Sequence, residues 1–308
     1  MARPPWTADF DLDVAYAARL IAEQFPELAG SHVRAFGNGW DNAAFLVDER
    51  FVFRFPRRRV AICLIERESA ILPSIAPRLP LRISSPCFVG APTAGYPSPF
   101  VGHELIAGAT ACSVPLGDEA RLQLAVPLAT FLRALHAIEP APLVARGLPP
   151  DEIGRLDHAK RLALTKERCR ALHAGGAALV WDELLVWMEE QPPEQLAARE
   201  RTIVHGDLYA RHVVLDESAR VVGIIDWGDV HLGDPALDIA LAHLFLPPPA
   251  HRAFRDAYGS IDERTWSAAR YRAIYHAVLV YDYGVSVGDA ALCEIARTAI
   301  GYLGSEIV

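Results

Sequence analysis

The spacing of apolar residues changes along the chain, and this change constrains the fold more than any other feature. Up to about residue 103, short apolar runs alternate with turns, and the runs at 43–47 and 51–55 flank an Asp-Glu-Arg turn at 48–50. This pattern predicts a β-hairpin. Beyond residue 103 apolar residues recur every three to four positions, which predicts helices at 121–138, 158–174, 177–189, 235–246 and 264–304. We therefore expect an α+β chain with a small β-rich lobe, residues 1–103, and a larger, mainly helical lobe, residues 104–308.

Short elements with recognisable boundaries complete both lobes. A helix is expected over residues 11–25, with Asp11 as its N-cap, and another over residues 60–72. A glycine-containing turn at 37–39 precedes the hairpin, and a proline-rich segment leads to a strand at 100–106. In the helical lobe, short apolar strands are expected at 201–204, 213–215 and 221–225.

Lysine is nearly absent from the chain, which excludes one common class of phosphate-binding site. Among 30 Lys and Arg residues only Lys160 and Lys166 are lysines. A Walker P-loop needs Gly-Lys-Ser/Thr, because the ammonium group reaches the phosphates that the glycine-rich backbone cradles. Neither lysine follows a glycine, so this site is excluded.

Charge and cysteine content exclude further classes of protein. The net charge of −8 is concentrated in residues 104–308, with 19 basic and 28 acidic residues, against 11 and 10 in residues 1–103. An acidic surface disfavours nucleic acid and favours small cationic ligands, although solubility alone also explains it. The five scattered cysteines form no CxxC pair and indicate neither a disulfide framework nor a zinc site. No run of 18 uncharged apolar residues occurs, so we expect a cytoplasmic protein without a membrane partner.

One segment carries the acidic residues best placed for chemistry. It reads Ile203-Val-His-Gly-Asp-Leu-Tyr-Ala-Arg-His-Val-Val-Leu215, and Gly223-Ile-Ile-Asp-Trp-Gly228 follows it. Asp207 comes directly after an apolar strand, where a carboxylate can accept a hydroxyl proton. Asp226 ends the next hairpin strand and offers hard oxygen ligands to a divalent cation. Together, His-x-Asp, a polar residue five positions on, a short hairpin and a second Asp are typical of the catalytic and metal loops of the kinase fold.

On these residues the chain resembles the aminoglycoside phosphotransferase (antibiotic kinase) family, whose members share the protein-kinase-like fold. The resemblance covers nearly the whole chain, and the motifs that carry it are His205-Gly-Asp207, Arg211-His212, Ile225-Asp-Trp227 and Gly233-Asp-Pro-Ala-Leu-Asp-Ile-Ala240. The resemblance implies a bilobal enzyme in which Asp207 is the catalytic base and Asp226 is the main ligand of Mg²⁺.

Position 212 departs from the usual pattern of this family. Most members have Asn there, and the macrolide phosphotransferase branch resembles this chain in having His. Imidazole nitrogen is a poor ligand for Mg²⁺. His212 is therefore expected to bind the metal weakly, to act through water or to hydrogen-bond Asp207, with a purely structural histidine as the alternative.

The resemblance also implies a nucleotide site in the first lobe. In this fold a strand lysine holds the phosphates and pairs with a helix glutamate. Here Arg54 stands at the lysine position, Glu68 is the expected partner and Glu66 is the second choice. Alternation along the strand places Arg54 on the face opposite the phenylalanines of residues 51–55. An arginine keeps the charge but changes the geometry of the contact.

Two further segments are expected to contact the nucleotide. In the turn from Gly37 to Asn42, the backbone from Gly39 onward and the side chain of Asn42 are expected near the phosphates. An ordinary hairpin turn fits as well, because the third glycine of GxGxxG is missing. Residues 101–108 are the expected hinge, whose main chain around Glu104 and Ile106 would bind the purine, and a plain linker would look the same.

Other polar residues are expected to support the catalytic loop. Asp234 precedes a proline and is explained as a helix N-cap. Asp238 lies inside an apolar helix, where an unpaired carboxylate would be costly, and the resemblance implies that it braces the loop at His205. His136 is expected to pack beneath the same loop.

The predicted function is transfer of the γ-phosphoryl group of ATP or GTP, with Mg²⁺, to a hydroxyl of a cationic antibiotic, either an aminoglycoside or a macrolide, conferring resistance. A metabolite kinase of the same family, acting on choline, homoserine or a sugar, is the first alternative. A nucleotide-binding pseudokinase that serves as an interaction module is the second, because Arg54 and His212 replace the usual Lys and Asn. Acceptor contacts are expected from acidic groups, which surface solubility also explains: Asp229, Asp282, Glu306 and the terminal carboxylate of Val308.

Overall fold

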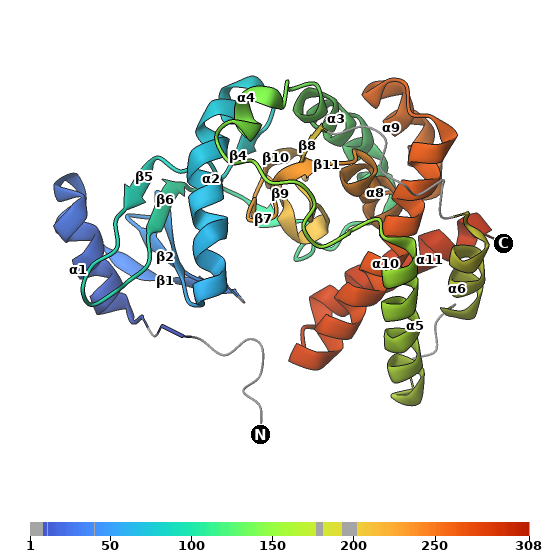
Figure 1. The fold of residues 1–308 in the computed structure, drawn as a ribbon, viewed down its shortest axis with the longest axis horizontal. Helices are drawn as coiled ribbons and strands as arrows, with labels where there is room; N and C mark the ends of the chain where they lie inside the picture. Colours follow the sequence, from blue (N-terminus) through green and yellow to red (C-terminus); the bar gives the residue numbers. More distant parts are fainter. Residues whose placement is uncertain (1–8, 11, 40, 177–180, 193–201, 308) are drawn as a thin grey trace. The chain divides into compact units, whose positions relative to one another are not determined.

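The chain forms two compact units, which we describe separately on a computed structural model (Figure 1). The structure describes residues 9–10, 12–39, 41–176, 181–192 and 202–307. The first unit runs to Arg78, continues over Arg82–Ile106 and includes Asp226–Asp229, and the second comprises Leu79–Leu81, Ala107–Ile225 and the chain from Val230 onward. The lobe boundary expected after residue 103 is close to the end of the first unit at Ile106, but the inclusion of Asp226–Asp229 could not be expected from periodicity.

The first unit is built on a five-stranded antiparallel sheet in the order β1-β2-β3-β6-β5. The predicted hairpin is confirmed, because β2 and β3 pair with Val47 opposite Phe51. Of the three residues between them, Asp48 and Glu49 both have a φ of 50°, and the Arg50 N–H donates to the Val47 carbonyl oxygen at 3.0 Å. Positive φ at both central residues is the requirement of a type I′ turn. The strands are β1 (Val33–Asn38), β2 (Asn42–Val47), β3 (Phe51–Pro56), β5 (Phe88–Gly90) and β6 (Phe100–Glu104), and a short strand, β4, covers Arg82–Ile83.

Aromatic side chains fill one face of this sheet. Phe53, Phe55 and Phe100 are fully buried, and the rings of Phe55 and Phe100 stack with centroids 4.4 Å apart. A Cβ at Gly102 would lie 2.6 Å from the Phe53 ring, so the packing requires glycine there. Because side chains alternate along β3, the same packing turns Arg54 to the opposite face.

Two helices of the first unit differ slightly from their predicted bounds. They are α1 (Val14–Gln24) and α2 (Ile62–Ile75). The N-cap of α1 is Asp13, whose carboxylate accepts a hydrogen bond from the Tyr16 N–H at 2.7 Å. The expectation of Asp11 as the cap was therefore wrong, and Asp11 itself lies outside the described residues.

Helices dominate the second unit, as the periodicity predicts. α8 is buried along its whole length and packs against α10, α11 and α3, while α5 lies beside α10 (Figure 1). The helices are α3 (Asp118–His136), α4 (Ala141–Val144), α5 (His158–Ala174), α6 (Trp181–Glu190), α8 (Ala236–Phe245), α9 (His251–Tyr258), α10 (Glu263–Val287) and α11 (Ala290–Ile307). The beginning of the helix predicted at 177–189 lies outside the described residues.

The long helical stripe predicted over 264–304 is divided in two. α10 ends at Gly288, which adopts a left-handed conformation with a φ of 69°. Glycine carries no Cβ penalty in this conformation, which is why it commonly ends helices. Apolar spacing continues across the break, so periodicity alone did not reveal it.

Short strands carry the loops between α6 and α8. β9 (Val213–Leu215) lies between β10 (Val221–Ile224) and β7 (Ala109–Thr110), and β8 (Thr202–Val204) pairs with β11 (His231–Gly233). Of the strand predicted at 201–204, Arg201 lies outside the described residues. Gly108, with a φ of 144°, precedes β7, and a Cβ there would lie 2.3 Å from the Leu215 carbonyl oxygen, so this crossing needs glycine.

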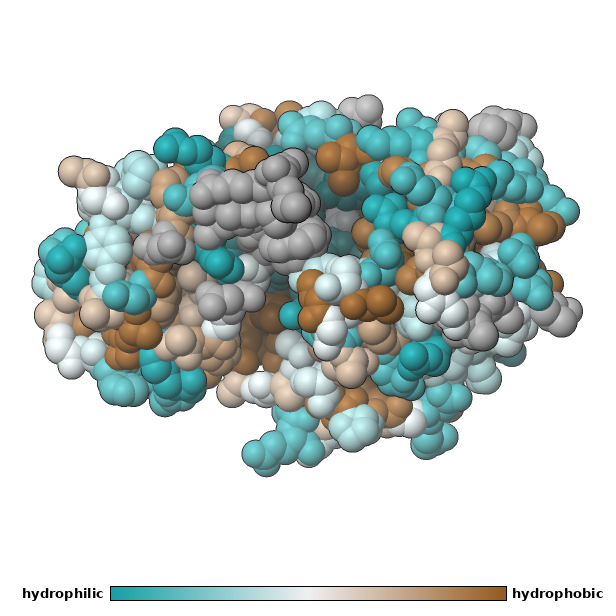
Figure 2. Space-filling model, turned by 90° about the horizontal axis from the view of Figure 1, so that it is seen from below, coloured by the Kyte–Doolittle hydropathy of each residue, from teal (hydrophilic) through white to brown (hydrophobic). Residues whose placement is uncertain are grey.

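The surface is mixed in polarity. On the face drawn in Figure 2, hydrophilic and hydrophobic residues are interspersed. Among the described residues, no helix combines the length and apolar character that crossing a membrane requires.

Candidate active site

The loop after β8 positions the residues of the predicted catalytic motif. Gly206 has a φ of 84°. Asp207 follows it, and a 3-10 turn at Ala210–His212 comes next in the chain. The His205 N–H and the Gly206 N–H both donate to the Asp238 carboxylate, at 2.7 and 2.9 Å. Asp238 is fully buried, so its charge is compensated by these donors and the loop is held from below.

His136 completes the contacts beneath the loop. Its Nε2 lies 3.2 Å from Asp238, and its Nδ1 lies 2.8 Å from the Tyr258 hydroxyl. Burial raises the pKa of Asp238, but the hydrogen bond and charge of His136 and the other donors outweigh burial, and the pKa is lowered. The structure thus places Asp238 and His136 where the sequence predicts them. The Asp234 carboxylate accepts the Ala236 N–H at 2.9 Å, as expected at the start of α8.

His205 connects the loop to the segment that carries Asp226. Its Nε2 donates to the Ile225 carbonyl oxygen at 3.0 Å, and its Nδ1 accepts the Asp207 N–H at 3.3 Å. These two bonds specify the neutral ring with the proton on Nε2, because a carbonyl oxygen can only accept. The Ile225 N–H also donates to the His212 carbonyl oxygen at 2.9 Å. The catalytic loop therefore fixes the peptide that leads directly into Asp226.

Two side chains of α10 hold one oxygen of Asp207. His276 Nε2 lies 2.9 Å and an Arg272 guanidinium nitrogen 3.4 Å from Oδ1. The same Arg272 nitrogen also lies 3.4 Å from the Gly206 carbonyl oxygen. Among the described residues Oδ2 has no hydrogen-bond partner, and the Asp207 side chain is one-third exposed. One oxygen is fixed and the other is free to meet a ligand.

The environment keeps Asp207 ionised. Burial raises its pKa, but the hydrogen bond and charge of His276, with His212 and Arg272, outweigh burial, and the pKa of Asp207 falls well below its usual range. Burial and Arg272 lower the pKa of His276 to about 4. A neutral His276 fits the contacts, because Nε2 donates to Asp207 while Nδ1, which has no partner among the described residues, needs none as a bare acceptor.

Sequence reasoning missed His276 and Arg272. They lie 69 and 65 residues beyond Asp207 in the chain, so no local motif links them. The available signal was the pair itself, since two polar side chains four positions apart share one side of the helix, among the mainly apolar residues that it buries.

His212 is oriented by the same loop. Its Nδ1 donates to the Asp207 carbonyl oxygen at 2.8 Å, and the ring is nearly buried beside Tyr209, with centroids 4.6 Å apart. Only Nε2 can therefore act as a metal ligand. The expected hydrogen bond to Asp207 exists, but it involves the backbone and not the carboxylate.

In the first unit, Arg54 joins Glu68 to Asp226. One guanidinium nitrogen donates to both Glu68 oxygens, at 2.7 and 3.0 Å, and the other lies 3.2 Å from Asp226 Oδ1. Glu68 is fully buried, whereas Glu66, the second choice, is exposed. Burial raises the pKa of Glu68 to about 7, and the charge of Arg54 opposes that rise. The structure brings together the pair that the sequence predicts.

Asp226 has a strained backbone. Its φ is 65°, which is uncommon for a residue other than Gly and is found at functional sites. About half of its side chain is exposed. Two residues on, a Cβ at Gly228 would lie 3.5 Å from the Leu64 side chain and 3.6 Å from Glu68, so α2 packs closely against the segment that carries Asp226.

The predicted phosphate loop is a turn between β1 and β2. The Gly39 N–H donates to the Asn42 carbonyl oxygen at 2.9 Å, and Trp40 lies outside the described residues. The Asn42 side-chain oxygen is buried without a hydrogen-bond partner among the described residues. A buried acceptor of this kind is costly unless a donor reaches it. Phosphate oxygens only accept hydrogen bonds, so the expected phosphate contact would involve the side-chain N–H₂ of Asn42 and not this oxygen.

In the predicted hinge, both the carbonyl and the carboxylate of Glu104 contact other side chains. The Glu104 carbonyl oxygen accepts from His103 Nδ1 at 2.9 Å, and the Glu104 carboxylate pairs with Arg82 at 2.7 Å. Ile106 is buried and ends the first unit. The Glu104 carbonyl oxygen thus already accepts one hydrogen bond, and purine binding at this position stays a prediction.

The acidic residues expected to bind the acceptor have different surroundings. Asp282 forms an ion pair with Arg168 at 3.4 Å, and Asp229 is half-buried and close enough to Glu68 to raise its pKa. Glu306 was expected at an open site, but its side chain is only 7% exposed and pairs with His243 and Arg270. It therefore presents no charge to an acceptor. Val308 lies outside the described residues.

Comparison with known proteins identifies related sequences and structures. A family described as "Phosphotransferase enzyme family" matches residues 32–272. An uncharacterised protein of Bacillus subtilis (strain 168), YcbJ, is 24% identical over 93 residues. That match covers 30% of this chain and 29% of YcbJ, so the chain is aligned to less than a third of that curated relative.

Solved structures resemble nearly the whole chain. The GDP complex of an aminoglycoside 2'-phosphotransferase-IIIa has a TM-score of 0.71 at 20% identity, covering 96% of this chain and all of that one. A macrolide 2'-phosphotransferase type I has a TM-score of 0.59 at 21% identity, covering 96% and 98%. The apoenzyme of MphH from Brachybacterium faecium, a macrolide 2'-phosphotransferase, gives 0.59 at 21%, covering 92% and 97%. Similarity at this identity shows the fold, and the predicted bilobal kinase-like architecture is confirmed.

Proposed function

We propose that this chain, which belongs to the phosphotransferase enzyme family, transfers the γ-phosphoryl group of ATP or GTP to a hydroxyl group of a cationic antibiotic. That it is a phosphotransferase follows from the family. The observation that carries the finer proposal is the state of Asp207, whose Oδ1 is fixed by His276 and Arg272 while Oδ2 has no partner among the described residues. A carboxylate held in this way can orient an acceptor hydroxyl on one side only.

Asp207 would act mainly by orientation. Phosphoryl transfer passes through a loose transition state in most analyses, so the hydroxyl needs to lose its proton only late. A carboxylate of lowered pKa is a weak base but remains an ionised hydrogen-bond acceptor. Oδ2 would accept the hydroxyl hydrogen bond, and His276 and Arg272 would stabilise the charge that remains on Oδ1.

Arg54 would hold the phosphates of the nucleotide. Its guanidinium already spans two carboxylates, Glu68 and Asp226, and its buried pairing with Glu68 fixes the side chain. A planar guanidinium presents several N–H donors and can bind phosphate oxygens in bidentate fashion. On nucleotide binding, the arm that contacts Asp226 can turn to phosphate while the arm on Glu68 stays in place. The buried oxygen of Asn42 could take a further ligand donor.

The residues also fit a divalent cation. Asp226, in the first unit, supplies carboxylate oxygen. His212 belongs to the second unit, and because its Nδ1 donates to the Asp207 carbonyl oxygen, it would have to act through Nε2. Bound Mg²⁺ would neutralise charge on the phosphates. Because Mg²⁺ prefers oxygen, Asp226 would be its main ligand and His212 would contribute through water.

The acceptor is proposed to be cationic because the second lobe is acidic. The net charge of residues 104–308 is −9 from 19 basic and 28 acidic residues, which attracts cationic acceptors. Structures of both aminoglycoside and macrolide phosphotransferases resemble this chain. Asp282 would have to exchange its partner Arg168 for an amino group of the acceptor, and Tyr281 and Tyr283 on either side of it would contribute an apolar rim. Asp229 is a second candidate acid.

An acceptor panel tests this function. Purified chain would be incubated with Mg²⁺, with ATP or GTP labelled at the γ-phosphate, and with aminoglycosides, macrolides, choline, homoserine and simple sugars. We expect phosphorylated product with an antibiotic and none in its absence. Product only from a metabolite would support the metabolite kinase. Bound nucleotide without any product would support the pseudokinase, whose motivation is that Arg54 and His212 replace Lys and Asn.

A further inference from the structure

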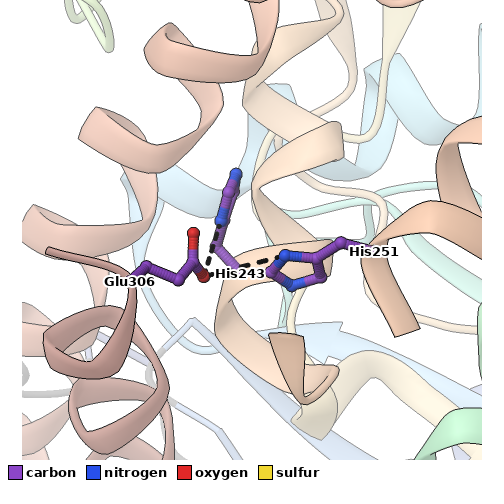
Figure 3. Close-up of side chains that lie close together, drawn as sticks. All are labelled: His243, His251 and Glu306. Carbon is purple, nitrogen blue, oxygen red and sulfur yellow. Dashed lines mark hydrogen bonds and ion pairs between the residues drawn. The ribbon is translucent and has the colours of Figure 1, made fainter. Parts of the chain in front are cut away.

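Three side chains outside the proposed active site converge in the second unit. His243 lies on α8, His251 begins α9 and Glu306 lies near the end of α11 (Figure 3). The Nδ1 atoms of His243 and His251 lie 3.2 and 3.8 Å from the same oxygen, Oε1 of Glu306. The ligand atoms of the three residues all lie within 4.8 Å of one another. Three elements far apart in sequence therefore present two imidazoles and one carboxylate to a common point.

The proton on His251 cannot lie between its ring and Glu306. His251 Nε2 lies 3.2 Å from the Ala242 carbonyl oxygen, and since that oxygen can only accept, Nε2 carries the proton. In a neutral ring Nδ1 is then a bare lone pair, and it faces a carboxylate oxygen. Two acceptors that face each other repel unless a cation lies between them.

Little solvent reaches this contact. The His251 side chain is only 12% exposed, and its ring lies beside that of His243 with centroids 5.0 Å apart. Arg270 pairs with the other Glu306 oxygen, Oε2, at 2.6 Å and leaves Oε1 to the two rings. A metal ion satisfies the same geometry, because it accepts lone pairs from both rings and from Oε1.

We propose that His243 Nδ1, His251 Nδ1 and Glu306 Oε1 bind one Zn²⁺ ion, which joins α8, the start of α9 and the end of α11. Zinc binds imidazole and carboxylate at about 2.0–2.2 Å, so neighbouring ligand atoms of a tetrahedral ion lie about 3.3 Å apart. The 3.2 and 3.8 Å contacts need only small adjustments to reach that value. Imidazole ligands also discriminate against Mg²⁺, which prefers oxygen.

The surroundings support the three ligands. The Ala242 carbonyl fixes the His251 tautomer, and Arg270 supports the carboxylate, as outer contacts of metal ligands commonly do. His243 Nε2 has no hydrogen-bond partner among the described residues, so moving its proton from Nδ1 to Nε2 breaks only the contact that the ion replaces. A hollow of about 640 Å³, lined by His251, Arg255 and Trp266 among others, offers water and ions a route to the site.

The zinc content of the full-length chain, prepared without an affinity tag, tests the proposal. The protein would be stripped with a chelator, dialysed and titrated calorimetrically with ZnCl₂ in excess Mg²⁺, and Co²⁺ would be added as a spectroscopic probe. We expect one Zn²⁺ per chain and a visible absorption band of tetrahedral Co²⁺. His251→Gln and Glu306→Gln should weaken zinc binding at least about tenfold, as loss of a contact at a metal site typically does. His173→Gln, which changes an exposed histidine of α5, is the matched control.

Thermal unfolding gives a second test of zinc binding. Zinc should also raise the melting temperature of the wild type and of His173→Gln, but not that of His251→Gln. If Glu306→Gln fails to fold, as judged by circular dichroism, His251→Gln alone decides, because its side chain is the most exposed of the three. Absence of binding to the wild type, or equal binding to the wild type and His251→Gln, would overturn the proposal and leave a histidine–carboxylate cluster that holds protons only.

Discussion

Two clusters of buried charge, one in each unit, have opposite designs. In the first unit a cation, Arg54, contacts two carboxylates, Glu68 at 2.7 Å and Asp226 at 3.2 Å. In the second unit an anion, Asp207, contacts the two donors His276 and Arg272. In the proposed function, the first cluster would offer N–H groups to an anionic ligand, and the second would offer a carboxylate oxygen to a hydroxyl group. A phosphotransferase needs both, because one substrate is a polyphosphate and the other an alcohol.

The comparison also separates a buried residue from an exposed one within each cluster. Glu68 is fully buried and serves to hold Arg54, while the Asp226 side chain is half exposed and open to a ligand. His276 is nearly buried and serves to hold Asp207, whose side chain is one-third exposed. Variants of the exposed members should therefore change ligand binding or turnover, and variants of the buried members should change stability as well.

The largest effect is expected from the anionic cluster. Asp207→Ala removes the group that orients the hydroxyl, and turnover should fall by at least about 10²–10⁴-fold, the range for loss of a general base. The rate of product formation with saturating nucleotide measures this. Retention of more than a tenth of the wild-type rate would show that Asp207 is not the catalytic carboxylate.

The buried member of the cationic cluster should have the next largest effect. Glu68→Gln removes the negative charge that Arg54 pairs with. Because burial already raises the pKa of Glu68 to about 7, the site partly tolerates a neutral side chain, and the expected cost is the roughly 1–3 kcal/mol of an unsatisfied buried donor. Chemical denaturation would measure the free energy of unfolding. Glu66→Gln, at an exposed position of the same helix, is the control and should change stability by less than about 0.5 kcal/mol. Equal changes in the free energy of unfolding in the two variants would show that the Arg54–Glu68 pair does not stabilise the fold.

A smaller effect is expected from changing the shape of the cation. Arg54→Lys keeps the charge but loses the two guanidinium nitrogens that contact Glu68 and Asp226 at the same time. Loss of one charged hydrogen bond corresponds to roughly a tenfold weaker affinity for nucleotide. Calorimetric titration with ATP and GTP checks this, and an unchanged affinity would mean that the charge alone matters.

The smallest effect concerns pH. The pKa of His276, about 4, lies below the value of about 6.5 expected in the unfolded chain. The unfolded state therefore binds more protons between these values, so the contribution of His276 to stability is complete above pH 6.5 and is lost as the pH falls toward 4. His276→Gln keeps an N–H donor for Asp207 but does not titrate. Unfolding curves from pH 7 to pH 4 should show a shallower decline for this variant than for the wild type.

The pH dependence of activity shows whether His276 positions Asp207 or only packs beside it. His276→Ala removes the donor, which raises the pKa of Asp207, so activity should disappear at a higher pH on the acid side of the profile. His276→Gln should restore the wild-type profile. An unchanged profile in both variants would mean that His276 only fills space beside Asp207.

The sequence predicted part of each cluster. The family resemblance implied the pair of Arg54 and Glu68, and strand alternation and helix position selected these residues, because β3 and α2 are adjacent in sequence. The contact of Arg54 with Asp226 was not predicted. The donors to Asp207 come from α10, and their approach depends on how α10 packs in the second unit, which no local pattern encodes. The same reason explains why Glu306 was misjudged. Its acidity was visible, but its burial against α8 and α9 was not.

The sequence also did not predict the backbone conformations of the loops. The position of Asp226 after a strand was predicted, but its left-handed backbone was not, because a positive φ is uncommon outside Gly. The end of α10 at Gly288 was missed because apolar spacing continues beyond it. By contrast, the cost of an unpaired carboxylate inside an apolar helix predicted that Asp238 has donors, and the resemblance implied that they come from the His205 loop.

The central claim is that the two clusters divide the work between them, one binding nucleotide and the other activating the acceptor. Nucleotide affinity in the presence of Mg²⁺, measured side by side for Asp207→Ala and Arg54→Ala, tests it most directly. We predict wild-type affinity for Asp207→Ala and a loss of at least about tenfold for Arg54→Ala. Equal loss in both variants, or loss in Asp207→Ala alone, would contradict the account.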